Sequence, residues 1–239
     1  MTPRDVIPLG WTAFLKNGPL TWGLDLATSE KKTANPSALV FNEKLGGMEI
    51  ERLVLAWKTD NPDVTEAIIG IALDDVKDSG RKCKNGNIDG SNERFFAQRL
   101  KKKFMLQCSI RIVAGNEKLA HGVEEFDAKT LLGSLYVNAY TDGFIAVPAG
   151  TWIKDDRRLV KRDKGRFDCD LGRMGEHGDT FDAGKLAHWG QVGRGGPAQA
   201  EGAPISESTV NPNRRDRLYD PHDPFVDLHR QGIHITVNF

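Results

Sequence analysis

The chain of 239 residues has little cysteine and no long apolar run, and both shortages narrow what it can be. Its three cysteines, Cys83, Cys108 and Cys169, are far apart and form no Cys-x-x-Cys pair. This argues against a zinc site and a disulfide framework and favours a reducing, cytosolic setting. No apolar stretch approaches the ~20 residues of a membrane span. Prolines and charged residues interrupt the first positions, so we expect no signal peptide there.

A surplus of charge of one sign is also missing, because 33 basic and 33 acidic residues give a net charge of zero. The balance is uneven along the chain. Positions 81–103 hold eight basic and two acidic residues, and positions 41–78 hold nine acidic and four basic residues. A Gly-x-x-x-x-Gly-Lys-Ser/Thr phosphate loop is absent as well, so we expect no nucleotide site in this chain.

Hydrophobic periodicity and turn signals predict an alternation of strands and helices. Strands are expected at residues 22–27, 38–42, 50–58, 83–89, 109–114 and 144–148, and helices at 61–80, 91–104, 128–139 and 179–189. The densely charged stretch 152–170 is typical of a β-hairpin around Lys164-Gly165. The first three strands form an antiparallel meander. The whole order resembles the ribonuclease H-like fold, an α/β mixed sheet with helices on both faces.

Composition divides the chain into three parts. Residues 1–20 contain three prolines and two glycines and are expected to be a linker or leader. Residues 21–190 hold the predicted strands and helices of the ribonuclease H-like sheet. Residues 191–239 hold five of the 11 prolines and a glycine-rich run, which is typical of a flexible tail. The alternating residues 234–239 have the pattern of an edge strand, in this chain or in a partner.

Three aspartates stand where separate elements begin or end. Asp25 ends the first strand between apolar neighbours, where an unpaired carboxylate is costly to bury. Asp89 lies in Ile88-Asp-Gly-Ser-Asn92 and is equally typical of a turn before a helix. Asp179 opens the last helix, where an N-cap with Asp182 at the third helical position is the ordinary alternative. Brought together, the three would form an acidic pocket for divalent cations, which indicates phosphodiester cleavage.

These segments resemble the nuclease domain of bacteriophage large terminase subunits, the DNA-packaging motors. The resemblance covers residues 20–190 and runs through three motifs: Gly23-Leu-Asp-Leu-Ala27, Ile88-Asp-Gly-Ser-Asn92 and His177-Gly-Asp-Thr-Phe-Asp-Ala-Gly-Lys-Leu-Ala187. It implies that Asp25, Asp89 and Asp179 are catalytic and bind two Mg²⁺ or Mn²⁺ ions. Asp182 is a further candidate metal ligand.

The same resemblance implies a substrate and partners. Domains of this family cut double-stranded DNA with little sequence preference at the start and end of genome packaging, and they follow an ATPase domain. Residues 21–190 would then be the ribonuclease H-like nuclease domain of a phage or prophage protein in the cytoplasm of the bacterial host. The expected partners are double-stranded DNA, a terminase ATPase domain outside this chain, the portal protein and the small terminase subunit, with no membrane partner.

Two basic stretches are candidates for holding the phosphate backbone of DNA. The helix at 91–104 carries Lys101 and Lys102. A solvated charged face is the ordinary alternative for both stretches. Trp152 and Phe167 are expected in the core rather than stacked on bases. The stretch expected as a hairpin carries the larger set: Arg157, Arg158, Lys161, Arg162, Lys164 and Arg166.

Other functions fit parts of the pattern. A Holliday-junction resolvase or a transposase would keep the acidic cluster and change the substrate. An actin-like sugar kinase has a first phosphate loop similar to residues 23–29, but we find no second phosphate loop. A non-catalytic packaging module would use the tail, including Arg214-Arg-Asp-Arg217, to bind another phage protein.

Overall fold

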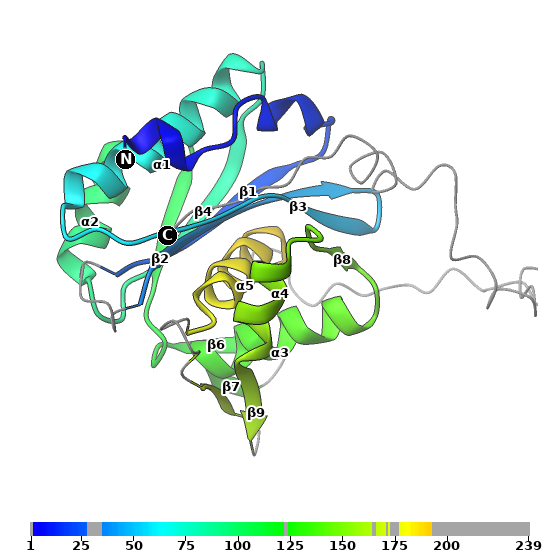
Figure 1. Cartoon of the computed structure of the whole chain (residues 1–239). Helices are drawn as coiled ribbons and strands as arrows, with labels where there is room; N and C mark the ends of the chain where they lie inside the picture. The colour runs from blue at the N-terminus through cyan, green and yellow to red at the C-terminus, as the bar shows by residue number, and fades with distance from the viewer. Residues whose placement is uncertain are drawn as a thin grey trace, which may run out of the picture.

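A mixed β-sheet separates two layers of helices (Figure 1). The computed structural model describes residues 2–27, 35–121, 124–163, 166–170, 172 and 177–192. Within these residues the sheet has six strands in the order β5-β4-β1-β2-β3-β8. This arrangement confirms the predicted mixed α/β sheet. The strand bounds are Leu20–Asp25 (β1), Ser37–Leu45 (β2), Met48–Trp57 (β3), Cys83–Asp89 (β4), Ser109–Val113 (β5) and Ile145–Ala146 (β8).

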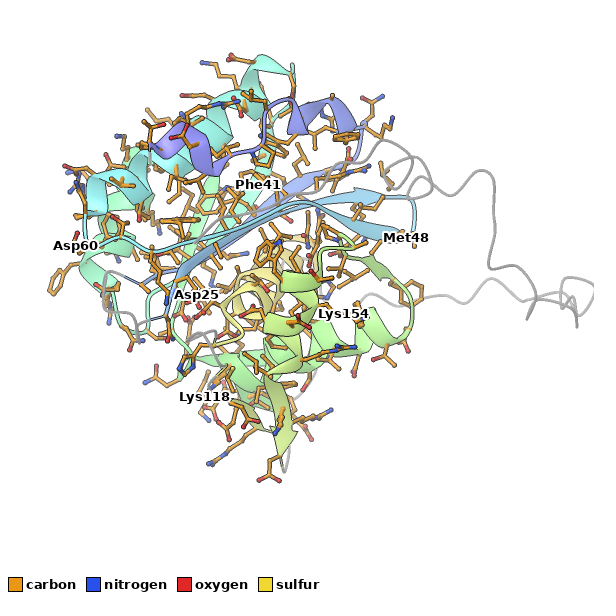
Figure 2. All side chains as sticks on the ribbon, viewed as in Figure 1. Asp25, Phe41, Met48, Asp60, Lys118 and Lys154 are labelled. Carbon is orange, nitrogen blue, oxygen red and sulfur yellow. The ribbon has the colours of Figure 1, made fainter. Side chains whose placement is uncertain are left out.

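The strand pairing combines an antiparallel meander with parallel strands. β1, β2 and β3 pair antiparallel in succession, as expected from the sequence. β4 runs parallel to β1, with Ile88 opposite Leu24, and β5 runs parallel to β4. β1 and β4 therefore end at the same edge of the sheet, where Asp25 and Asp89 are their last residues. Asp25 and Met48 lie at opposite ends of the sheet (Figure 2).

Helices cover both faces of the sheet. On one face lie α1 (Pro62–Asp78) and α2 (Arg94–Phe104), and on the other lie α3 (Ala128–Thr141), α4 (Thr151–Arg158) and α5 (Asp179–Val192) (Figure 1). α1 begins where the Asn61 side chain accepts a hydrogen bond of 2.9 Å from the backbone N–H of Asp63. Buried Ile68 and Ile69 on this helix pack with Phe41 of β2 in the larger core (Figure 2).

The segment before β1 is part of the folded core. It forms two 3-10 helices, Pro3–Val6 and Trp11–Phe14. Asp75 of α1 accepts hydrogen bonds from the Arg4 guanidinium at 2.7 and 2.8 Å and from the indole of buried Trp11 at 3.0 Å. Pro3 opens the first of these helices, and Gly10, with a φ of 73°, precedes the second. Any role of the segment as a connection to another domain stays a prediction.

The prediction of one hairpin over 152–170 is wrong in its first half. That half is helix α4, and the hairpin is formed only by β9 (Val160–Asp163) and β10 (Arg166–Cys169). One side of α4 is buried and the other is exposed: Ile153 and Asp156 are buried, whereas Lys154 and Asp155 are exposed. A dense run of charge, together with a buried face that itself contains an aspartate, hid this helix from the sequence pattern.

A second hairpin, β6 (Lys118–His121) with β7 (Glu124–Asp127), was not predicted. Among the residues of its two strands only Leu119 is buried, so the alternation typical of a strand is too weak to recognise. Trp152 and Phe167 were expected in the core, and both pack against core clusters. Phe167 is buried in a core cluster, and Trp152 is half-buried against a neighbouring one.

Helix α5 crosses the sheet at backbone contact distance. Gly23 of β1 lies beneath it, and a Cβ at Gly23 would lie 2.1 Å from the carbonyl oxygen of Ala183 and 2.4 Å from the amide nitrogen of Ala187. Glycine is therefore required at this strand position. The Thr21 hydroxyl donates a hydrogen bond of 2.8 Å to the carbonyl of Ala187, which fixes the helix along the strand.

Polar side chains of β4 also bind the backbone of α5. The Asn87 amide donates to the carbonyl of Leu186 at 2.8 Å, and the Asn85 amide donates to the carbonyl of Gly190 at 2.8 Å. These asparagines explain why β4 is poor in the β-branched residues that usually mark a strand. The strand is built to hold a helix through hydrogen bonds rather than through apolar side chains.

We expect Gly23→Ala to destabilise the protein by about 3 kcal/mol, because the added methyl group overlaps the α5 backbone and forces the helix away from β1. Urea denaturation followed by circular dichroism measures this change. Gly47→Ala in the β2–β3 turn is the matched control, because a Cβ there meets nothing within 4 Å. Equal unfolding midpoints for the two variants would show that the contact at Gly23 is not tight.

Candidate active site

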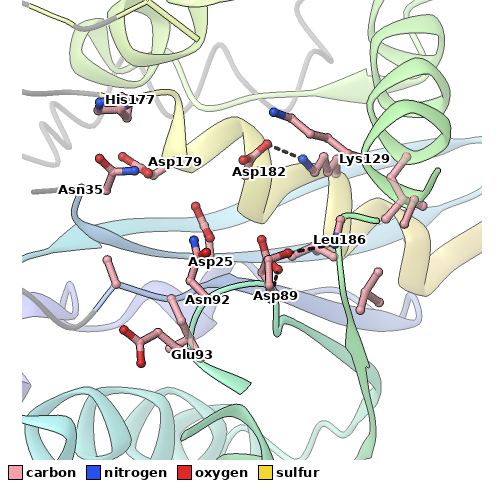
Figure 3. A pocket seen from close by; sticks show the side chains of 18 of the residues that line it. Asp25, Asn35, Asp89, Asn92, Glu93, Lys129, His177, Asp179, Asp182 and Leu186 are labelled. Carbon is pink, nitrogen blue, oxygen red and sulfur yellow. Dashed lines mark hydrogen bonds and ion pairs between the residues drawn. The ribbon is translucent and has the colours of Figure 1, made fainter. Parts of the chain in front are cut away.

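Four aspartates from three elements line one cavity of about 510 Å³, and Glu93 lines it as well (Figure 3). Asp25 and Asp89 end the neighbouring parallel strands β1 and β4, and Asp179 and Asp182 lie in the first turn of α5. Close packing on Gly23 brings the first turn of α5 to these strand ends. The structure thus brings together the three aspartates predicted to be catalytic, with Asp182 beside them.

Burial and negative neighbours disfavour the charged form of Asp25. Desolvation is the largest cause, followed by repulsion from Asp182, Asp179 and Asp89, and together they raise the pKa of Asp25 well above its usual range. Lys185 acts in the opposite direction. Clustered carboxylates of this kind cost free energy in the absence of a cation, and such clusters are typical of functional sites.

Asp179 opens α5 with its carboxylate in the interior. The residue is 2% exposed, and within the described part of the chain its Oδ2 atom is buried without a hydrogen-bond partner. Desolvation, followed by repulsion from Asp156 and Asp182, raises the pKa of Asp179 to about 8. A buried carboxylate oxygen without a partner is costly, and a hard cation such as Mg²⁺ would satisfy it.

The N-terminus of α5 is capped by a residue of another helix. Asp156 of α4 accepts hydrogen bonds from the backbone N–H groups of Gly178 at 2.9 Å and Thr180 at 3.0 Å, and from the Thr180 hydroxyl at 2.5 Å. Gly178 has a φ of 73°, which favours glycine. Asp156 is 22 residues before Gly178, so local sequence carries no signal for this contact.

The alternative interpretation, in which Asp179 caps its own helix with Asp182 as capping-box partner, does not hold. Asp179 is the first helical residue, and the side chain of Asp182 pairs with Lys185 instead. Because Asp156 takes over the capping role, the carboxylate of Asp179 is free to face the cavity.

Asp89 is both a turn residue and a cavity residue. Its Oδ1 atom accepts a hydrogen bond of 2.8 Å from the backbone N–H of Ser91, which is the turn expected from the sequence. The Ser91 hydroxyl accepts a hydrogen bond of 2.8 Å from the N–H of Gly115 and so anchors the turn. Since the turn uses one carboxylate oxygen, the two interpretations of Asp89 are compatible.

A lysine lies inside the acidic cavity. Lys185 is 6% exposed, and its ammonium group pairs with Asp182, one helical turn earlier, as the dashed line at Asp182 in Figure 3 shows. In the sequence, the spacing of three residues between Asp182 and Lys185 is the signal that could have identified this ion pair. His177 also lines the cavity, next to the start of α5.

Arg157, predicted to contact DNA, has a structural role instead. Its guanidinium lies in the interior, 2.7 Å from the carboxylate of Glu51 and 2.8 Å from the hydroxyl of Tyr136. The side chain of Arg157 is 13% exposed, and that of Glu51 is fully buried. Removing this arginine from the ion pair to meet a phosphate would leave a buried carboxylate unpaired, which is strongly unfavourable.

The other basic candidates lie on the surface at two places. Lys101 and Lys102 are in the second half of α2 and do not line the cavity, whereas Cys169 of β10 does. The β9–β10 hairpin is therefore at the rim of the cavity. Lys164 lies outside the described residues. The exposed candidates on α4 and the hairpin are Arg158, Lys161, Arg162 and Arg166.

The donor atoms of the cavity suit hard divalent cations. Carboxylate oxygens are the ligands that Mg²⁺ and Mn²⁺ prefer. Cys169 is protonated, because desolvation and then Asp156, Asp179 and Asp182 raise the pKa of its thiol to about 12. Among the described residues, no three histidine, cysteine or acidic side chains already form a closed cation cage. Mutual repulsion keeps carboxylates apart, and a bound cation removes that repulsion.

We expect Asp156→Asn to destabilise the protein by about 1–2 kcal/mol, because an amide cannot accept all the hydrogen bonds that the carboxylate receives. Hydrogen exchange should become faster at the amides of residues 178–182 and remain unchanged in β2. Asp155→Asn is the control, because Asp155 is exposed on the same helix. Unchanged exchange in α5 would mean that Asp156 does not hold the helix start.

Comparison with known proteins gives structural matches and no sequence match. No family model matches the chain, and no curated protein matches it. The nuclease domain of the large terminase subunit gp2 of bacterial virus Sf6, solved with manganese and beta-thujaplicinol, has a TM-score of 0.52 and 11% identity. The large terminase of a thermophilic bacteriophage has a TM-score of 0.48 and 14% identity, and the human cytomegalovirus terminase nuclease domain has 0.39 and 10%.

The lengths covered differ among these proteins. The match spans 78% of this chain and 98% of the Sf6 domain, 72% of this chain and 40% of the thermophilic phage terminase, and 61% of this chain and 71% of the cytomegalovirus domain. The chain thus spans about two fifths of the length of the thermophilic phage terminase. At such low identity the similarity to the Sf6 domain establishes the fold. This chain shares the mixed α/β fold of the nuclease domain of the Sf6 large terminase subunit.

Proposed function

We propose that this chain is a metal-dependent endonuclease that cuts double-stranded DNA during phage genome packaging, as the nuclease domain of a large terminase. One observation carries the proposal: Asp25, Asp89 and Asp179 meet in one cavity, and an oxygen of Asp179 is buried there without a partner. The fold shared with the Sf6 nuclease domain supports the assignment, and the structure of that domain contains manganese.

The three carboxylates would hold two Mg²⁺ or Mn²⁺ ions, one between Asp25 and Asp179 and one between Asp25 and Asp89. Such ions supply an activated water and neutralise the leaving oxygen in phosphodiester hydrolysis. The protein contributes a cluster in which desolvation and repulsion raise the pKa values of Asp25 and Asp179. Binding of a cation relieves this repulsion, so the cluster itself favours cation binding.

The exposed arginines and lysine of the β9–β10 hairpin would hold the DNA backbone beside the cavity. Lys161, Arg162 and Arg166 are exposed, and Cys169 of the same hairpin lines the cavity. Contacts of this kind bind phosphate without reading sequence. They suit an enzyme that cuts DNA with little sequence preference.

The biological setting belongs to the same proposal. The motor function would come from an ATPase domain outside this chain, and the portal protein and the small terminase subunit would be further partners. The chain would act in the cytoplasm of the bacterial host, as part of a phage or a prophage. Within the described residues, no helix combines the length and the apolar character needed to cross a bilayer.

We expect the full chain to nick and linearise supercoiled plasmid in the presence of Mn²⁺, and EDTA to abolish this activity. Asp25→Asn and Asp179→Asn should each reduce the cleavage rate at least ~100-fold, because each removes a charged ligand of the cations. Initial rates from gel electrophoresis measure the effect.

The matched control for these variants is Asp74→Asn, because Asp74 is exposed on α1, across the sheet from the cavity. It should cut at the wild-type rate. Full activity of Asp25→Asn would contradict the proposal. Faster cutting of a four-way junction than of linear duplex would favour a resolvase, and no cleavage under any metal condition would favour a non-catalytic packaging module.

We expect the double variant Arg162→Ala, Arg166→Ala to bind duplex DNA more weakly. Its slope of log affinity against log salt should fall by roughly one unit for each phosphate that the hairpin no longer binds. Fluorescence anisotropy measures both values in an Asp25→Asn background, which prevents cleavage. The control pair Lys82→Ala, Lys84→Ala removes two exposed charges at the opposite end of β4. Equal salt slopes for the two double variants would show that the hairpin does not bind DNA phosphates.

A further inference from the structure

One buried lysine contributes to the charge balance of the acidic cavity by acting on Asp25, and Lys58 acts in the same sense on Asp179. The described residues that line the cavity include two lysines, Lys129 and Lys185. The Lys129 side chain is 51% exposed, and its ammonium is 4.0 Å from Asp168, on the hairpin side. Lys185 is 6% exposed and therefore places its positive charge inside the cavity. Of these two lysines, only Lys185 is shielded from solvent well enough to act strongly on the carboxylates.

Lys185 is held in place by its neighbours on α5. Its ammonium pairs with Asp182 and lies 5.9 Å from the centre of the Phe181 ring, a distance at which a cation is attracted to the ring face. A buried ammonium is stable only when it is paired in this way. The pair therefore positions both charges, and it occupies an oxygen of Asp182.

Asp182 is also the carboxylate that repels Asp25 most strongly, and Lys185 is the group that offsets this repulsion. Without the lysine, four aspartates and Glu93 would face one small cavity. They would attract divalent cations more strongly, and in more than one arrangement. With the lysine, three aspartates remain for cations, from the ends of β1 and β4 and the start of α5.

We propose that Lys185 is a permanent cation of the site. It holds Asp182 in an ion pair, keeps Asp182 out of the set of metal ligands, and limits the affinity of Asp25, Asp89 and Asp179 for divalent ions. This inference rests on the proposed function, because it requires that the cavity binds such ions. It assigns Asp182 a positioning role in place of the ligand role suggested by the sequence.

The test is calorimetric titration of the metal-free full chain with MnCl₂, without DNA. Lys185→Gln should bind Mn²⁺ about fivefold to tenfold more tightly than the wild type, because removing a buried positive charge strengthens the attraction of the carboxylates for a cation. Lys185→Arg should bind like the wild type. The control Lys129→Gln makes the same charge change on an exposed side chain and should alter the affinity less than about twofold.

A purely structural role for Lys185 would give the opposite sign, because loosening the cavity weakens binding. Unchanged or weaker Mn²⁺ binding by Lys185→Gln would overturn the inference. Should that variant fail to fold, Asp182→Asn decides the question: it should bind as many Mn²⁺ ions per chain as the wild type, and loss of an ion would show that Asp182 is a ligand. Absence of Mn²⁺ binding by the wild type would overturn the proposed function together with the inference. If the wild type binds Mn²⁺ and Lys185→Gln does not bind it more tightly, only the inference is overturned.

Discussion

Backbone contact between α5 and β1 at Gly23 determines where the acidic cavity forms in this protein. The missing side chain lets the helix lie directly on a central strand, with the carbonyl of Ala183 where a Cβ would otherwise be. Hydrogen bonds from Thr21 and Asn87 fix the helix along β1 and β4. As a result, the first turn of α5 meets the ends of two parallel strands. The acidic cavity is a consequence of that packing.

Concentrating negative charge in a small cavity costs free energy, and the surrounding structure offsets part of this cost. Asp156 caps α5 and thereby holds the helix start in place, although its charge also repels Asp179. Lys185 places a positive charge among the carboxylates. Behind them, Arg157 binds Glu51 in a buried ion pair that ties α4 to β3. The remaining repulsion makes the cavity receptive to cations, which is the property that a metal-dependent nuclease requires.

Local sequence predicts some elements of this fold and misses others. The alternation of strands and helices from β1 to α2 was predictable, because each element carries its own apolar period and its own start and stop signals. α4 was mistaken for a strand because its buried face consists of only Ile153 and Asp156. β6 and β7 were missed because a single buried leucine cannot display an alternation. Short elements that are stabilised by contacts with neighbouring segments show no clear hydrophobic periodicity in their own residues.

The sequence by itself determined the mixed α/β character of the chain, the placement of three aspartates at the boundaries of elements, and the basic composition of the last hairpin. Those features depend on residues close together along the chain. Only the tertiary structure decided that Arg157 is buried, that Asp156 caps α5 and that Lys185 lies inside the cavity. These outcomes depend on which surfaces meet when distant segments pack, and the physical reason is that burial and pairing arise from the packed neighbours rather than from the residue type.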